Sequence, residues 1–330
     1  MKSKAVWRGI IVATLVARVC SWTTPVLAQE AVKVDPAIPA YQPVSGISGN
    51  LSSIGSDSMN NLMTLWAEGF KKFYPNVNIQ VEGKGSSTAP PALIEGTAQL
   101  GPMSRPMRGT EIDAFEAKYG YKPTPLRTSL DSLAVFVHKD NPIKGLSISQ
   151  VDAIFSKTQR CKSANATTWG QVGIGDAAWA GVPISLYGRN SASGTYGFFK
   201  EHALCNGDYK DSVKEQPGSA SVVQGVSEDR GAAGYSGIGY KTSGVRAVPV
   251  AAKEGDAPQE ATYENVIAGK YPLARYLFIY INRPEGQASD PLVREFAKFI
   301  FSKEGQEVVI KDGYYPVPVT ITREEAAKVQ

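Results

Sequence analysis

The chain of 330 residues has little of the chemistry that builds metal centres and catalytic triads, because it contains only three cysteines and two histidines. His138 and His202 stand far apart, and no recognisable motif surrounds either of them. A zinc site takes several Cys or His ligands, and a Ser-His-Asp triad needs one well-placed histidine. We therefore expect no metal site and no cofactor, and we interpret both histidines as structural.

Long apolar runs are also lacking, and the run near the N-terminus is too short to span a bilayer. Residues 9–17 are apolar and follow three basic residues within the first eight positions. A membrane span needs about 20 apolar residues. Small residues at 26–28 offer a cleavage site, so the pattern predicts a signal peptide over residues 1–28 and export of the mature chain. An uncleaved anchor is the alternative.

An excess of charge of either sign is absent once the signal peptide is set aside. The chain holds 35 Lys and Arg against 31 Asp and Glu, and residues 1–28 contain four of the basic residues and none of the acidic ones, which leaves 31 of each sign. Nucleic-acid partners attract proteins mainly through a basic surface, so we exclude this class. Any binding of an anion must come from local geometry.

Two cysteines remain in the mature chain, Cys161 and Cys205. In an oxidising compartment an isolated pair is more often a disulfide than a metal site, so we predict a bond between them. The closed loop is long, and the chain-entropy model gives a stabilisation of about 3–4 kcal/mol.

The length exceeds one typical domain of about 100–200 residues, which favours two lobes. Hydrophobic residues make up 42% of the chain and charged residues 20%, as in ordinary globular proteins. Residues 29–46 are rich in Ala, Pro and Val without a period, so we expect a loose leader before the fold.

A unit of strand, hydroxyl-rich turn and helix occurs twice near the start of the fold. A short apolar run at 51–54 leads through a turn into a helical pattern at 62–73, and an alternating strand at 77–81 leads through a second turn into a helix that begins near Pro90. This repetition predicts an α/β fold with a mostly parallel sheet and with the turns at the carboxyl ends of the strands.

Further elements follow the same logic along the rest of the chain. Continuous apolar runs indicate buried strands, and periodic patterns indicate helices. The predicted strands are 133–138, 182–187, 245–250 and 277–281, and the predicted helices are 110–118 and an amphipathic helix over 291–313.

Four turns contain hydroxyl side chains, three of them also contain glycine, and two contain arginine. They lie at 55–59, 85–88, 103–106 and 189–195. A helix N-terminus has unpaired N–H groups and a partial positive charge, and an arginine fork can bind two oxygens of an oxyanion. Each turn alone is explained as well by helix capping, but four in one α/β pattern favour an anion site.

The run "GRNSASGTYGFF" resembles the Arg-x-x-x-Ser-Gly-Thr loop of the phosphate-binding proteins that serve the high-affinity phosphate ABC transporter (PstS type). Other stretches on both sides of this run resemble motifs of that family. They stand in the expected order along the chain and cover about residues 48–318. They are "SIGSDSM", "LMTLWAEGFKKFYPNVNIQVEGKGSST", "GPMSRPM", "LDSLAVFVHKDNP", "GYSGIGY", "YPLARYLFIYIN" and "SKEGQEVVIKDGYYPVP".

The resemblance implies a two-lobed periplasmic-binding-protein (Venus-flytrap) fold, with a mixed, mostly parallel sheet flanked by helices in each lobe. We expect lobe 1 to comprise 47–135 and 246–330, and lobe 2 to comprise 136–245. It further implies phosphate ligands from both lobes. The implied ligands are Ser58, Met59, Ser86, Ser104, Arg105, Arg189, Ser193, Gly194 and Thr195.

The third loop departs from one well-known form of the family, in which an aspartate accepts the proton of hydrogen phosphate. The matching position here is Ser104, followed by Arg105. Asp57 is our first candidate for the missing acceptor and Asp131 the second, with a helix cap and a hinge hydrogen bond as the respective alternatives. Three other arginines, Arg127, Arg230 and Arg275, could line a cleft, but we interpret them as surface or interlobe ion pairs.

The expected function is capture of inorganic phosphate in the periplasm and its delivery to the permease subunits of an ABC transporter in the inner membrane, by a monomer that is not an enzyme. Another oxyanion (sulfate, molybdate, arsenate or a phosphonate) is one alternative, and a sensor or adhesion role is another. A secreted phosphatase or hydrolase that uses Ser193 or Thr195 is disfavoured, because no Gly-x-Ser-x-Gly elbow, basic partner or metal cluster accompanies them.

Overall fold

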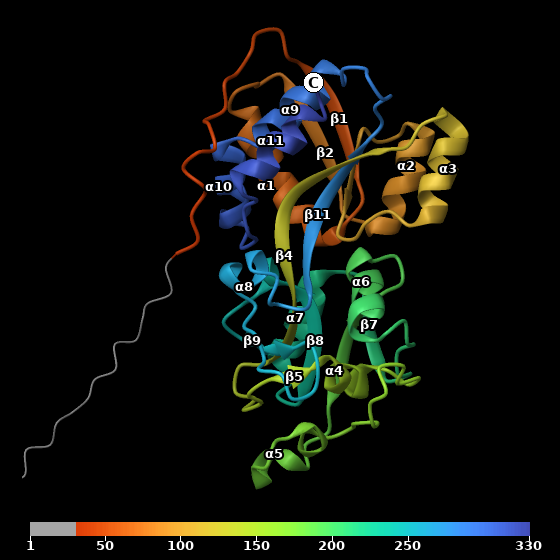
Figure 1. Cartoon of the computed structure of the whole chain (residues 1–330), viewed down its shortest axis with the longest axis vertical. Coiled ribbons are helices and arrows are strands. Elements are labelled where there is room, and N and C mark those ends of the chain that lie inside the picture. Colours follow the sequence, from red (N-terminus) through yellow and green to blue (C-terminus); the bar gives the residue numbers. More distant parts are fainter. Residues whose placement is uncertain (1–30) are drawn as a thin grey trace, which may run out of the picture. The chain divides into compact units, whose positions relative to one another are not determined.

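The computed structural model describes residues 31–330, so the predicted signal peptide of residues 1–28 lies outside the described part of the chain. Within residues 31–330, no helix is both long and apolar enough to cross a membrane. The fold is the predicted α/β type, with parallel strands on both sides of an antiparallel centre (Figure 1).

The first group of strands is parallel and leads into the first three of the four predicted turns. It consists of β2 (Val77–Glu82), β1 (Gly49–Ile54) and β3 (Leu100–Met103), in that spatial order. We call the elements around these strands the first lobe. Its helices are α1 (Asn60–Lys71), α2 (Ala89–Glu95), α3 (Gly109–Tyr119), α9 (Pro291–Ile300), α10 (Lys303–Lys311) and α11 (Val319–Ala327), with short 3₁₀ turns η1 (Asp57–Met59) and η2 (Ser86–Thr88).

The second group of strands is also parallel. It consists of β8 (Ala232–Gly237), β6 (Ser185–Arg189) and β7 (Val213–Gln216). We call the elements around these strands the second lobe. Its other elements are β5 (Leu146–Ser147), β9 (Val245–Ala247), β10 (Val250–Ala251), α4 (Ile148–Phe155), α5 (Ala177–Ala180), α6 (Gly194–Ala203), α7 (Ser219–Glu228), α8 (Tyr263–Ile267), η3 (Trp169–Val172) and η4 (Ile238–Tyr240).

Two antiparallel strands, β4 (Thr124–His138) and β11 (Ala274–Ile281), lie between the lobes (Figure 1). The first part of β4, from Thr124 to Ser132, pairs with β11, whereas Leu133 to Val137 pair with β8 of the second lobe. One continuous strand therefore belongs to both sheets, and the change of partner at Ser132–Leu133 marks where the lobes join.

Each lobe has its own hydrophobic core. The first lobe packs around Trp66, Phe70 and Phe296, which are fully buried. The second packs around Trp169 and Phe199, together with the buried side chains that lie C-terminal to the predicted 245/246 boundary: Val248, Val250, Val266 and Leu273. Trp66 and Trp169 are packing residues, because each is fully buried in the core of its lobe.

Two segments differ from the sequence-based expectation. From residue 31 to β1 the leader has no helix or strand, yet it packs against the first lobe: Tyr41 is buried, and its hydroxyl bonds Tyr74 and Glu295. The predicted helix over 291–313 is two helices, because the Ser302 hydroxyl accepts from Gly305 N and caps a new helix start. A side chain at Gly305 would meet the carbonyl of Phe299, so the break also depends on glycine.

Candidate functional site

Five strand ends meet at the junction of the two lobes, and each leads into a turn or helix start. From the first lobe, β1 leads into η1, β2 into η2, and β3 into residues 104–106; from the second lobe, β6 leads into α6 and β7 into α7. The sequence predicted four of these turns. It missed the start of α7, although "QPGSAS" after a short strand carries the same signal of glycine and serine.

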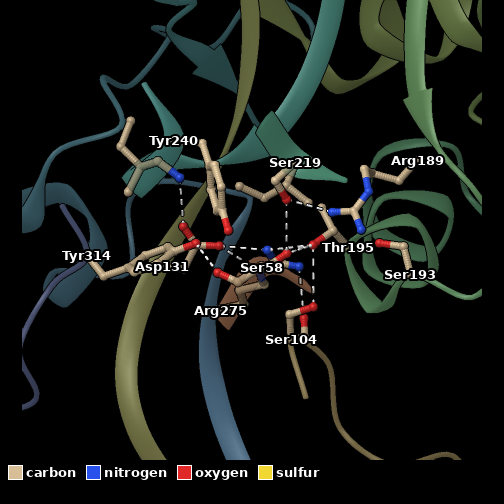
Figure 2. Close-up of polar contacts among 12 residues, drawn as sticks. Ser58, Ser104, Asp131, Arg189, Ser193, Thr195, Ser219, Tyr240, Arg275 and Tyr314 are labelled. Atoms are coloured by element: carbon tan, nitrogen blue, oxygen red, sulfur yellow. Dashed lines mark hydrogen bonds and ion pairs between the residues drawn. The ribbon is translucent and has the colours of Figure 1, made fainter. Parts of the chain in front are cut away.

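Five hydroxyl side chains converge at this junction and are almost fully buried (Figure 2). Ser58 Oγ lies 2.6 Å from Thr195 Oγ1 and 3.5 Å from Ser219 Oγ. Ser104 Oγ lies 3.4 Å from Thr195 Oγ1 and 3.3 Å from Ser86 Oγ. We call these five residues the hydroxyl cluster. Because they come from both lobes, they meet only when the lobes are closed on each other.

The close approach of the lobes depends on glycine in the loop that precedes α6. A Cβ on Gly194 would lie 2.1 Å from Ser86 Oγ and 2.7 Å from Ser104 Oγ. The backbone N–H of Ser87 donates to the carbonyl of Ala192 across the same contact, at 3.1 Å. Ser193 caps α6, since its hydroxyl accepts from Tyr196 N at 3.3 Å.

Arg189, at the end of β6, brings a buried positive charge to the cluster. Its Nη1 donates to Ser219 Oγ at 2.6 Å and lies 3.2 Å from Asp57 Oδ2, while Nη2 donates to the carbonyl of Pro217 at 3.1 Å. The side chain is 1% exposed, and its Nε has no hydrogen-bond partner among the described residues. The Nε–H group of Arg189 is thus a buried donor that a ligand could use.

Asp57 links the two lobes. It begins η1 in the first lobe, and its Oδ2 accepts from Ser219 N of the second lobe at 2.8 Å as well as facing Arg189. The Tyr240 hydroxyl donates to the carbonyl of Asp57 at 2.9 Å, and the Tyr314 hydroxyl donates to the carbonyl of Ser58 at 2.7 Å. Burial raises the pKa of both tyrosines, so they remain protonated donors that hold η1 in place.

A second arginine, Arg275, also reaches the cluster, which the sequence did not predict. It lies on β11 opposite Asp131 of β4, and its Nε donates to Asp131 Oδ2 at 2.8 Å. Its Nη1 donates to the carbonyl of Ser104 at 2.8 Å and its Nη2 to Thr195 Oγ1 at 3.0 Å (Figure 2). The predicted ion pair exists, but it is buried and touches the cluster.

Two predicted ligands do not reach the cluster. The guanidinium of Arg105 turns toward α3, where two 2.7 Å hydrogen bonds join it to Glu111. Burial opposes ionisation of Glu111, yet the bonds from Arg105 and the backbone of Arg108 hold its pKa below the ordinary value. Met59 buries its side chain in the first core, and its N–H donates to the carbonyl of Ser56 at 3.2 Å.

The predicted disulfide between Cys161 and Cys205 is confirmed, with Cα atoms 5.4 Å apart. Cys205 lies just after α6, whose other end carries Gly194 and Thr195. The bond therefore fixes the far end of the helix that begins at the cluster.

Comparison with known proteins reveals related chains over most of this sequence. A family model described as a PBP superfamily domain matches residues 41–304. Phosphate-binding protein PstS of Pseudomonas aeruginosa is 57% identical over 303 residues, which cover 91% of this chain and 93% of that protein. The PstS protein of Bacillus subtilis is 29% identical over 288 residues, or 85% of each chain.

Solved structures resemble the fold. A Clostridium perfringens protein assigned to a phosphate ABC transporter, solved with bound phosphate, is 28% identical with a TM-score of 0.67 and covers 82% of this chain and 100% of that one. An ABC-type phosphate transport receptor from Vibrio cholerae has 24% identity and a TM-score of 0.61, with coverages of 81% and 100%, and supports the fold alone. The family match includes both lobes and all five members of the hydroxyl cluster.

Proposed function

We propose, on the premise that this chain belongs to the PBP superfamily and within it to the PstS-type phosphate-binding proteins, that it binds inorganic phosphate between its two lobes. The supporting observation is the buried convergence of five hydroxyls and the Arg189 guanidinium, with one Nε donor unpartnered among the described residues. A buried donor without a partner is costly unless a ligand takes it. An oxyanion has enough acceptor oxygens to take this donor and the hydroxyl protons together.

The ligands that we propose are Ser58, Ser86, Ser104, Arg189 and Thr195, with Ser219 added. Gly194 allows the close approach, and Ser193 caps α6 so that its first N–H groups face the ligand. We assign Arg105 to holding the third loop through Glu111 rather than to phosphate, and Met59 to the core.

Of the two candidate proton acceptors, we propose Asp57. Both oxygens of Asp131 are occupied, Oδ1 by Ile238 N at 2.9 Å and Oδ2 by Arg275, and its side chain is fully buried. Asp57 contacts Ser219 N and Arg189 through Oδ2 alone. Its Oδ1 accepts no hydrogen bond from the described residues. A free carboxylate oxygen beside a site of donors favours hydrogen phosphate, which carries a proton, over sulfate, which carries none at neutral pH.

We further propose that the protein is exported to the periplasm and delivers phosphate, as a monomer and without catalysis, to an ABC permease. The predicted signal sequence and the disulfide support the compartment. We propose that the chain crosses between the lobes at Ser132–Leu133 on β4, where the strand partner changes from β11 to β8, and at Ala274, where β11 begins. Those two crossings would supply the hinge.

The enzyme alternative finds little support at this site. The Ser193 hydroxyl is occupied as a helix cap, and Thr195 Oγ1 accepts from Arg275, which removes electron density instead of activating the oxygen. The oxyanion alternative (sulfate, molybdate, arsenate or a phosphonate) uses the same residues, so a binding experiment must include competitors.

The first prediction concerns Arg189. The Arg189→Ala change removes a buried charged donor, and we expect phosphate affinity to fall by about 100-fold or more. Titration calorimetry of the mature protein with phosphate and with sulfate measures this directly. Arg323→Ala, at an exposed position of α11, is the matched control and should bind like the parent. Absence of phosphate heat from the parent protein would end the proposal.

The second prediction concerns the choice between phosphate and sulfate. We expect Asp57→Asn to lower the ratio of phosphate affinity to sulfate affinity by about tenfold. An amide that presents its N–H group no longer accepts the phosphate proton. Competition of each anion against labelled phosphate gives the ratio. An unchanged ratio would remove Asp57 as the acceptor while leaving phosphate binding itself in place.

A further inference from the structure

We infer that Arg275 is a positioning residue for the anion site, which fixes the direction in which the Thr195 hydroxyl donates its proton. This inference rests on the proposed function, because it assigns Arg275 a role in holding phosphate. The sequence analysis set aside a place in the cleft for Arg275, which belongs to a strand and to none of the hydroxyl-rich turns.

The contacts of Arg275 tie together both lobes and the joining strands. Its three nitrogens donate to Asp131 of β4, to the carbonyl of Ser104 in the first lobe and to Thr195 Oγ1 in the second. Asp131 Oδ1 in turn accepts from Ile238 N of η4. Both side chains are buried, with 2% and 0% exposure for Arg275 and Asp131. The guanidinium therefore has one available orientation.

That orientation decides how the Thr195 hydroxyl is used. A guanidinium donates but never accepts, so Thr195 Oγ1 must be the acceptor in the bond from Arg275. The single proton of Thr195 then points away from Arg275, toward the side where Ser58 Oγ lies at 2.6 Å and Ser104 Oγ at 3.4 Å. An oxyanion held among these hydroxyls receives the Thr195 proton in place of Ser58 Oγ or Ser104 Oγ, and Arg275 cannot accept it.

The same bond strengthens Thr195 as a donor. Hydrogen bonds in a chain polarise one another, so a hydroxyl that accepts from a cation becomes a better donor. Arg189 and Arg275 thus act differently: Arg189 has a free Nε for direct contact, whereas all of the Arg275 nitrogens are used on the protein. Asp131 compensates the charge of Arg275. Arg275 therefore acts on the ligand by orienting the Thr195 hydroxyl and not by its net charge.

The test is a set of variants read by phosphate calorimetry and thermal unfolding. Removing Arg275 alone would leave Asp131 buried and unpaired, so the main variant is the neutral double change Arg275→Gln with Asp131→Asn. We expect it to fold and to bind phosphate about tenfold or more weakly, and we expect Thr195→Val to lose a similar factor. Combining all three changes should cost no more than the larger of the two losses, since both remove the same donor.

Two further variants distinguish the orienting role of Arg275 from its positive charge and from a general loss of structure. Arg275→Lys keeps the positive charge but lacks the fork, and it should fail to restore affinity. Arg283→Gln lies beyond the opposite end of β11 and should bind like the parent. Should the neutral double variant not fold, the lysine variant carries the test alone, with weakened binding in support.

The outcomes that overturn the inference are distinct from those that overturn the function. Parent-like affinity in the neutral double variant or in Arg275→Lys, or losses that multiply in the triple variant, would overturn the role of Arg275 while phosphate binding by the parent protein stands. Failure of the parent to bind phosphate would overturn both.

Discussion

Gly194 shows that the site depends on a missing side chain as much as on those present. The loop before α6 lies so close to the first lobe that a single methyl group would overlap Ser86 and Ser104. Hydroxyls from different lobes can share one small anion only at such a distance. The glycine therefore serves the closed arrangement and not the fold of either lobe.

A Gly194→Ala variant should consequently keep its stability and lose its ligand. We expect phosphate affinity to drop by at least tenfold, because the added Cβ meets Ser86 Oγ at 2.1 Å. Gly109→Ala, at the start of α3 with no neighbour within 4 Å of the added atom, is the control. Calorimetry gives the affinities and thermal unfolding gives the stabilities. Parent-like phosphate binding by Gly194→Ala would show that the closed contact is not needed.

At the residue scale the sequence located four of the five cluster hydroxyls, but it missed Ser219 and the support from Arg275. Ser58, Ser86, Ser104 and Thr195 stand in turns with a shared composition, and composition is visible in a sequence. Arg275 acts through its register opposite Asp131, which lies 144 residues away in the chain. Strand register over such a separation leaves no local pattern, so this pair could not be placed from the sequence.

Among the elements, α6 connects the site to the disulfide. Its first turn carries Gly194 and Thr195, and Cys205 follows its last turn after ten helical residues, or about 15 Å. The bridge to Cys161 anchors the end that lies away from the ligand. The N-terminal end of α6 thus carries binding residues, and its C-terminal end is held by the disulfide that contributes to stability.

Replacing both cysteines by serine should separate these two properties. The bond closes a loop with a sequence separation of 44, so the chain-entropy model predicts a loss of about 4 kcal/mol in the free energy of unfolding. Phosphate affinity at 25 °C should change by less than about threefold. Urea unfolding and calorimetry measure the two quantities. An unaltered urea midpoint would contradict the prediction, as would a large loss of affinity in a variant that is still folded.

The sequence predicted strand boundaries well where the whole strand is apolar. It predicted them poorly where a strand is polar in one part and apolar in another. The apolar run 133–138 is only the second part of β4, which begins at Thr124. Its first part reads "TPLRTSLDS" and carries many polar residues, because it runs through the region where Arg275 and the hydroxyl cluster lie. A polar stretch of strand at a binding site does not show the pattern of a core strand.

For the whole molecule, the junction of the lobes also contains a titratable group that the site does not use. Asp312 follows α10, and a Cβ on Gly239 of η4 would lie 2.6 Å from its carbonyl oxygen. Burial raises the pKa of Asp312 to about 7, and its Oδ2 has no hydrogen-bond partner among the described residues. In the folded protein the carboxyl is therefore mainly neutral below about pH 7.

The raised pKa makes global stability depend on pH. Between about pH 4, where the carboxyl titrates in the unfolded chain, and about pH 7, the folded state binds more protons than the unfolded state. The Asp312 contribution to the free energy of unfolding thus falls as pH rises through this window. We expect Asp312→Asn to gain about 1–2 kcal/mol over the parent between pH 5 and pH 8, after allowance for partial exposure.

Urea unfolding of the parent and of Asp312→Asn at several pH values checks this. The conservative amide keeps the shape of the side chain, so a difference that is constant with pH would indicate packing alone. Such a constant difference would contradict the assigned titration.

The division into lobes was the hardest property to predict at this scale. The length and the resemblance indicated two lobes, but the expected limit at 245/246 came from the position of a β-rich segment. Packing of Val250, Val266 and Leu273 beside Trp169 depends on contacts over about 100 residues of chain. No local signal distinguishes a strand that ends a lobe from one that remains within it.

The position of β11 has a consequence for the order in which a growing chain can fold. In the first sheet β11 lies between β3 and β4, although it follows β3 by about 170 residues. Every strand of the second lobe, from β5 to β10, is synthesised before it. The second lobe can therefore complete its sheet before β11 is available, whereas the edge of β3 stays unpaired until β11 arrives. Until then the first-lobe strands expose an unpaired strand edge, which is the kind of surface that favours aggregation.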